Sequence, residues 1–123
     1  MNQKDTSCKT PRWFFLKAQL NNLGPDAFKE AVEAAEPAIL IDVRTPKEYE
    51  EDRMEGALNI SYFDENLWEQ LEHLDKTASF FVYCRSGRRS IRVCTLMRNG
   101  GFDNSKVFNL DGGMLAWRKK YPL

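Results

Sequence analysis

The fold is decided by residues 79–90, which read SFFVYCRSGRRS. The run from Ser79 to Tyr83 is nearly all apolar and ends at Cys84, a pattern typical of a strand buried on both faces of a parallel sheet. The loop that follows turns at Gly87 and enters a stretch with helical spacing of apolar residues. Because parallel strands are joined through crossover helices, this strand, loop and helix predict one βαβ unit.

Strands and helices alternate in the same way on both sides of this unit. Further strands are predicted over 38–43, 57–60 and 106–110. Such alternation indicates an α/β fold with right-handed crossovers and a parallel sheet flanked by helices on both faces. Helices are expected to follow Pro25, Thr45, Asp64, Gly87 and Asp111.

Local signals define the ends of several elements. Thr45 with Glu48 forms a capping box, and Asp64 and Asp111 are predicted to cap two later helices. Residues 21–25 have turn chemistry, with Pro25 suited to the first position of a helix. The predicted domain covers residues 13–123 and follows a flexible tail over 1–12. At its start, residues 13–16 are predicted to form a first strand or a segment packed on the domain.

Length and composition restrict the class of protein. The chain has 123 residues, 42% hydrophobic and 29% charged, which indicates one soluble globular domain. It contains no apolar run long enough to span a bilayer. The polar N-terminus lacks the apolar stretch of a signal peptide, so we expect a cytoplasmic protein with no membrane partner.

Charge is balanced overall but uneven along the chain. Eighteen acidic and eighteen basic residues cancel, which argues against a nucleic-acid partner. Residues 85–98 hold five arginines and no acid. This block favours a small anionic ligand, and the alternative is a solvated helix face.

The cysteines are Cys8, Cys84 and Cys94. Their odd number, wide spacing and lack of a CxxC motif argue against a disulfide framework or a metal site. Cys94 falls inside an amphipathic helix and is expected to be a core residue. The only histidine, His73, lies off the apolar stripe of its helix, so no cysteine–histidine pair is expected.

Cys84 is the candidate nucleophile. It stands at the carboxyl end of a buried strand, where ligands bind in open α/β folds. The unpaired N–H groups at the following helix N-terminus, together with nearby arginines, stabilise a thiolate. Gly87 lets the loop curl tightly enough for its amides to converge.

Several motifs together resemble the single-domain rhodaneses. They begin with Asp42-Val43-Arg44 followed by Glu48-Tyr49, continue with Gly56-Ala57 and the Cys84 loop, and end with Leu110-Asp111-Gly112-Gly113 before Ala116-Trp117. The resemblance covers about residues 24–118. It implies a rhodanese-like fold with a five-stranded parallel sheet, and a catalytic cysteine that carries a persulfide. Asp52-Arg53-Met54 stands where the family usually has Gly-His-Ile, so we expect the local hydrogen bonding there to differ from that of the family.

The resemblance implies a sulfurtransferase that needs no cofactor. Cys84 would take a sulfane sulfur from thiosulfate or a similar anionic donor and pass it to cyanide or a thiol acceptor, such as a thioredoxin-like protein. The expected substrate-binding residues are Arg85, Ser86, Gly87, Arg88, Arg89 and Ser90. Asp42 and Arg44 are expected to form a structural ion pair, the alternative being that they shape the loop.

Two other functions remain open from the sequence. One is a persulfide carrier that serves a partner enzyme without turning over small substrates. The other is a related phosphatase or arsenate reductase, in which a cysteine loop binds an oxyanion. The spacing from Cys84 to Arg89 is Cys-x4-Arg, one residue shorter than the Cys-x5-Arg of a phosphatase loop, and therefore favours sulfur over a phosphoryl group.

Overall fold

The computed structural model describes residues 12–122, which form one parallel sheet with helices packed against it. The sheet order is β1-β5-β4-β2-β3, and all four strand pairs are parallel, as the sequence predicts. The strands are β1 (Asn21–Leu23), β2 (Ala38–Asp42), β3 (Leu58–Asn59), β4 (Ser79–Tyr83) and β5 (Val107–Leu110).

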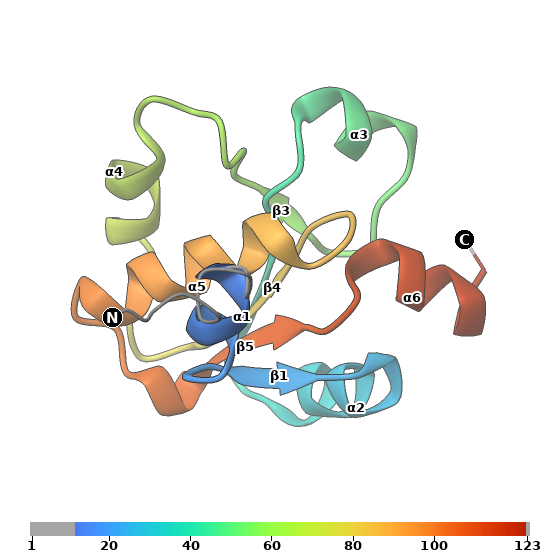
Figure 1. Ribbon diagram of the computed structural model, residues 1–123, viewed down its shortest axis with the longest axis horizontal. Coiled ribbons are helices and arrows are strands. Elements are labelled where there is room, and N and C mark those ends of the chain that lie inside the picture. Colours follow the sequence, from blue (N-terminus) through green and yellow to red (C-terminus); the bar gives the residue numbers. More distant parts are fainter. Residues whose placement is uncertain (1–11, 123) are drawn as a thin grey trace, which may run out of the picture.

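Helices cover both faces of the sheet (Figure 1). On one face α4 (Leu67–Glu72) and α5 (Arg88–Asn99) close a core, and on the other α2 (Pro25–Ala34) and α6 (Gly113–Lys120) close a second one. The remaining helical segments are α1 (Arg12–Lys17), α3 (Pro46–Glu51) and the 3-10 turn η2 (Asn104–Lys106).

Strand β4 lies at the centre of the sheet and contributes side chains to both hydrophobic cores. Phe80 and Val82 belong to the core under α5, while Phe81 and Tyr83 belong to the core under α2 and α6. This alternation is the period of two that a strand imposes on its side chains. Because β4 is buried on both sides, its carboxyl end is rigidly placed, and Cys84 follows directly.

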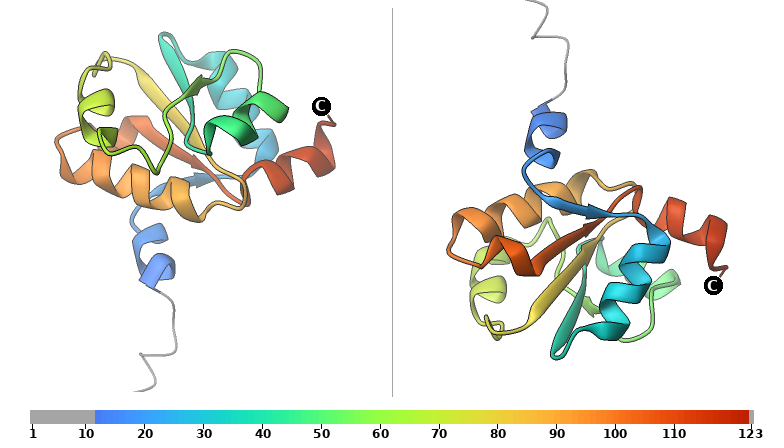
Figure 2. Two further views of the ribbon diagram at one scale, coloured as in Figure 1. Left: turned by 90° about the horizontal axis from the view of Figure 1, so that it is seen from above. Right: turned by 90° about the horizontal axis from the view of Figure 1, so that it is seen from below.

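The segment before α2 differs from the sequence prediction. Asn21–Leu23 was predicted as part of a turn, but it forms β1, the edge strand that pairs with β5. Its strand conformation comes from this tertiary pairing, since three residues carry little local signal. The stretch at residues 13–16 is not a strand: it lies in α1, which packs on α5 and projects from the body in Figure 2.

Two of the three predicted caps are wrong. The Thr45–Glu48 capping box at α3 is confirmed, with both reciprocal hydrogen bonds present. However, α4 begins after Asn66, and Asp64 instead accepts a hydrogen bond from a glutamine side chain. Likewise α6 begins after Gly112, whose left-handed backbone suits glycine, and Asp111 pairs with a lysine of α1.

The predicted flexible tail over 1–12 cannot be compared as a whole. Residues 1–11 lie outside the described part of the chain, and Arg12 already begins α1. The domain boundary at residue 13 stays a prediction. Among residues 12–122, no helix is both long and apolar enough to cross a membrane.

Candidate active site

The sulfur of Cys84 is held by backbone amides at the end of β4. Its side chain is fully buried, and its Sγ accepts hydrogen bonds from the backbone N–H groups of Gly87 at 3.1 Å and Ser90 at 3.4 Å. Gly87 is the N-cap of α5 and has a φ of 100°, a left-handed conformation that favours glycine. The predicted tight loop with converging amides is therefore present.

The start of α6 supports this loop from behind. The N–H of Met114 donates to the carbonyl of Cys84 at 2.9 Å, and the N–H of Leu115 donates to that of Arg85 at 3.1 Å. A Cβ on Gly113 would lie 2.5 Å from the Arg85 carbonyl oxygen, so only glycine allows this approach. Because α6 binds two carbonyls of the loop, the loop is held in a conformation in which its N–H groups face the sulfur.

The three arginines of the loop have different surroundings in the structure. Arg85 and Arg88 are exposed, and the Arg88 guanidinium lies 4.9 Å from the centre of the Trp13 ring. Arg89 forms a two-pronged ion pair with Glu48, with nitrogen–oxygen distances of 3.0 and 3.3 Å. The charge of Arg89 is thus largely balanced within the protein.

Glu48 was predicted only as a capping residue, and the structure gives it a second contact. Its hydrogen bond with Arg89, assisted by those from Thr45, lowers its pKa from 4.5 to about 2. The pair therefore stabilises the folded loop fully above pH 4.5, and this contribution is lost as the pH falls toward about 2. The sequence signal that could have indicated a further role for Glu48 was its place in the family motif, four residues after Arg44.

An exposed aromatic side chain flanks Arg89. Phe63, in the segment after β3, is 65% exposed, and its ring centre lies 5.8 Å from the Arg89 guanidinium. Neither strand nor helix periodicity distinguishes this residue, so sequence reasoning missed it. It adds an apolar surface beside an otherwise polar loop.

A buried ion pair lies under the neighbouring strand end. Arg44 is 2% exposed and Asp42 is fully buried, with 2.7 Å between Arg44 Nη2 and Asp42 Oδ2. The structural ion pair expected from the sequence is confirmed. Asp52, from the unusual triplet, accepts hydrogen bonds from Arg44 and also from Arg118 of α6, so this departure from the family pattern has its own hydrogen-bond partners.

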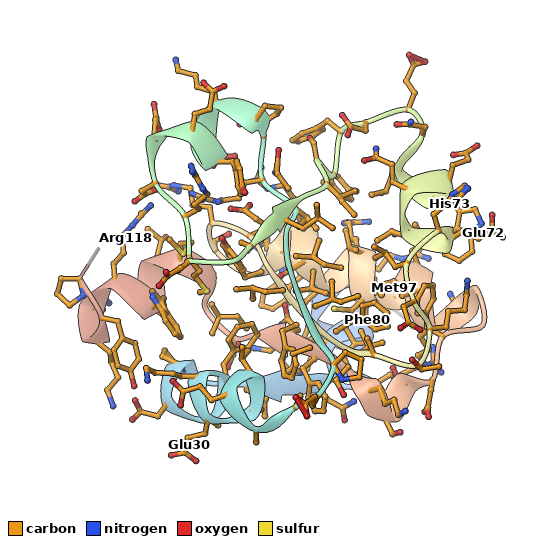
Figure 3. All side chains as sticks on the ribbon, turned by 180° about the vertical axis from the view of Figure 1, so that it is seen from behind. Glu30, Glu72, His73, Phe80, Met97 and Arg118 are labelled. Atoms are coloured by element: carbon orange, nitrogen blue, oxygen red, sulfur yellow. The ribbon has the colours of Figure 1, made fainter. Side chains whose placement is uncertain are left out.

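The other singled-out residues lie away from the loop amides. Cys94 is buried in α5, and burial raises its pKa, which confirms a core thiol. His73 lies at the surface beside Glu72, while Met97 and Phe80 lie inside the protein (Figure 3). Among residues 12–122, no group of three or more potential ligand side chains is arranged to hold a metal ion.

The sheet and the loop together define an α/β protein whose central strand ends in an amide-bound cysteine. A family model of the Rhodanese-like domain matches residues 24–120. The chain therefore belongs to the rhodanese-like family, as its motifs indicate.

Individual relatives agree with this assignment. The chain is 38% identical over 99 residues to "Putative sulfurtransferase YtwF" of Bacillus subtilis, covering 80% of this chain and 91% of that protein. It is 30% identical over 88 residues to "Thiosulfate sulfurtransferase GlpE" of Pseudomonas entomophila, covering 72% and 77%. A solved rhodanese-like domain protein from Staphylococcus aureus superposes with a TM-score of 0.68 at 26% identity, over 80% and 91%. These relatives support a rhodanese-type role in sulfur transfer.

Proposed function

We propose that the protein is a sulfurtransferase that uses thiosulfate or a similar anionic sulfane donor. The Cys84 thiolate attacks the outer sulfur of the donor, the donor's sulfur–sulfur bond breaks, and sulfite leaves with the bonding electron pair. The product is a Cys84 persulfide whose outer sulfur carries the negative charge. Cyanide or a thiolate then attacks that outer sulfur, and Cys84 leaves as a thiolate.

The observation that carries this proposal is the pair of backbone donors on Cys84 Sγ. Fixed N–H dipoles at a helix N-terminus stabilise a thiolate and an anionic leaving group without reorganising. Once the thiolate has formed, the reaction also needs no side-chain base. A protein thiol such as that of a thioredoxin-like protein is the acceptor class we propose for the cell, with Phe63 as apolar surface for it.

The same geometry weakens the phosphatase alternative. A phosphoryl group would need an arginine at the end of the loop that is free to bind its oxygens in two-pronged fashion. Arg89, the loop arginine in the Cys-x4-Arg spacing, is already bound in that fashion to Glu48. Sulfur transfer makes no such demand on it.

A direct comparison of activities tests the proposal. We expect thiosulfate-to-cyanide sulfur transfer to exceed aryl phosphatase turnover, both measured on the same preparation with Cys84→Ser as the blank. Mass spectrometry after incubation with thiosulfate should show the mass of one added sulfur atom on Cys84. Phosphatase turnover that exceeds sulfur transfer and depends on Cys84 would reject the proposal. A stable persulfide without turnover of small acceptors would instead indicate a carrier.

Neutralising Glu48 is expected to improve capture of the donor. In Glu48→Gln the Thr45 cap and one hydrogen bond to Arg89 can persist, but the loop gains one positive charge. We expect kcat/KM for thiosulfate to rise about fivefold at low salt, which corresponds to roughly 1 kcal/mol of added attraction. The gain should shrink as ionic strength increases, because salt screens exposed charges.

The matched control is Glu72→Gln on α4, which makes the same change of charge at a residue outside the loop. It should leave kcat/KM for thiosulfate unchanged. If Glu48→Gln gave no gain over this control, the Arg89 charge would have no part in attracting the donor, and the backbone amides alone would bind it.

A further inference from the structure

A chain of hydrogen-bonded side chains leads from the sulfur of Cys84 to the junction between α1 and β1. Cys84 Sγ lies 3.5 Å from Ser90 Oγ, and Ser90 Oγ lies 2.6 Å from Asn109 Oδ1. Asn109 Nδ2 in turn lies 2.9 Å from Asn22 Oδ1. Ser90 and Asn109 are buried, so water does not compete for their hydrogen bonds.

The direction of every hydrogen bond in this chain is fixed at its far end. Asn22 Nδ2 donates to the backbone carbonyls of Lys17 at 2.8 Å and Leu20 at 3.2 Å, which can only accept. Asn22 Oδ1 must therefore face Asn109, and Asn109 must present its Nδ2 to Asn22. Asn109 Oδ1 is then left facing Ser90.

Ser90 has one hydroxyl proton, and this proton goes to Asn109 Oδ1. Toward Cys84 the hydroxyl oxygen can act only as an acceptor, and it receives the S–H of the protonated thiol. Against a thiolate the same oxygen would present lone pairs to a negative sulfur. The Ser90 hydroxyl thus opposes the two backbone N–H groups that favour the thiolate.

We propose that Ser90, Asn109 and Asn22 are positioning residues that shift the balance of Cys84 toward the protonated thiol in the resting protein. The thiolate is the form that oxidants attack, so this shift lowers the reactivity of the sulfur toward oxidants. Asn22 and its carbonyl partners lie before residue 24, where the family match begins. The N-terminal segment of this chain therefore acts on its reactive sulfur.

Other ionisable and charged groups around Cys84 are left in place by the test. On α5 these are Arg89 and Cys94, and on α3 Glu48 pairs with Arg89. The Asp42–Arg44 pair lies at the end of the adjacent strand β2. None of them is altered in the variants below.

The test is the rate of iodoacetamide alkylation of Cys84 against pH, read by mass spectrometry at that residue. Asn109→Leu removes the acceptor and frees the Ser90 hydroxyl to donate to the thiolate, so the alkylation midpoint should move about one pH unit lower. Asn22→Ala, which disturbs the buried sheet less, should move it in the same direction by about half a unit, because Asn109 is then free to reverse its amide.

The control is Asn21→Ala. Asn21 lies in the same strand and likewise donates to two backbone carbonyls, but those belong to Asn104 and Val107, outside the chain to Cys84. Its midpoint should equal that of the unmodified protein. Equal shifts in Asn21→Ala and Asn22→Ala would show a general effect of loosening β1 and would overturn the proposal.

In Ser90→Ala, the direction in which the alkylation midpoint moves shows whether the hydroxyl accepts from the thiol or donates to the thiolate. If the hydroxyl acts as an acceptor for the thiol, its removal moves the midpoint to lower pH. A move to higher pH would mean that Ser90 donates to the thiolate, and the proposal would be wrong. The inference deepens the proposed function, since it concerns the nucleophile of that site. Alkylation does not need a sulfur donor, however, so failure of sulfur transfer and failure of this proposal are separately visible.

Discussion

A Cys84→Ser variant is expected to lose sulfur transfer by about a thousandfold or more, since it removes the thiol that we propose forms the covalent intermediate. A serine hydroxyl does not ionise near neutral pH and has no sulfur to form a persulfide. The fold should survive, because serine is close in size and the amides of Gly87 and Ser90 can donate to its oxygen. Thiosulfate-to-cyanide kinetics measure the loss, and circular dichroism checks the fold.

Cys94→Ser is the matched control for this variant. Cys94 is equally buried, but it lies inside α5, and its raised pKa keeps it protonated. We expect sulfur transfer to be retained, with a decrease of about 1–2 kcal/mol in the free energy of unfolding from burying a hydroxyl. Substantial activity in Cys84→Ser, or its loss in Cys94→Ser in a folded protein, would contradict the assignment of the nucleophile.

The second large effect is expected on stability. Arg44→Met leaves the carboxylate of Asp42 buried without its partner. Removing one member of a buried ion pair costs about 3–5 kcal/mol, a large part of the total stability of a small domain. Urea unfolding followed by tryptophan fluorescence should show this loss as a lower midpoint at similar slope.

The double variant Asp42→Leu/Arg44→Met isolates the cause. Replacing both charges by apolar groups is often close to neutral, so we expect most of the lost stability to return. A double variant no more stable than Arg44→Met would show that the cost comes from lost packing or from the lost bonds between Arg44 and Asp52 rather than from the unpaired charge.

The central strands could be predicted because their signal is local. β2 and β4 are nearly continuous apolar runs, a pattern typical of strands in a sheet that is covered on both faces. β1 could not, because its two asparagines and one leucine favour a turn by themselves and become a strand only through pairing with β5. The failed caps at Asp64 and Asp111 have a similar cause, since each carboxylate found a partner more distant in sequence.

In the candidate site, too, the local features could be predicted from the sequence and the contacts between distant residues could not. Cys84, Gly87 and the helix that follows are contiguous, so the amide-bound sulfur could be foreseen from one stretch of sequence. The contacts that modify it come from far along the chain: Glu48 is 41 residues from Arg89, and Asn22 is 87 residues from Asn109. Single-sequence reasoning has no signal for such pairs, because only the folded sheet brings them together.

The support that α6 gives to the cysteine loop has a consequence for synthesis of the chain. Two loop carbonyls find their N–H donors only at Met114 and Leu115, some thirty residues after the cysteine itself. On the ribosome, Cys84 therefore leaves the exit tunnel well before the residues that shape its surroundings. The hydrogen bonds that hold the cysteine loop are therefore completed only after α6 has been synthesised and has folded against it.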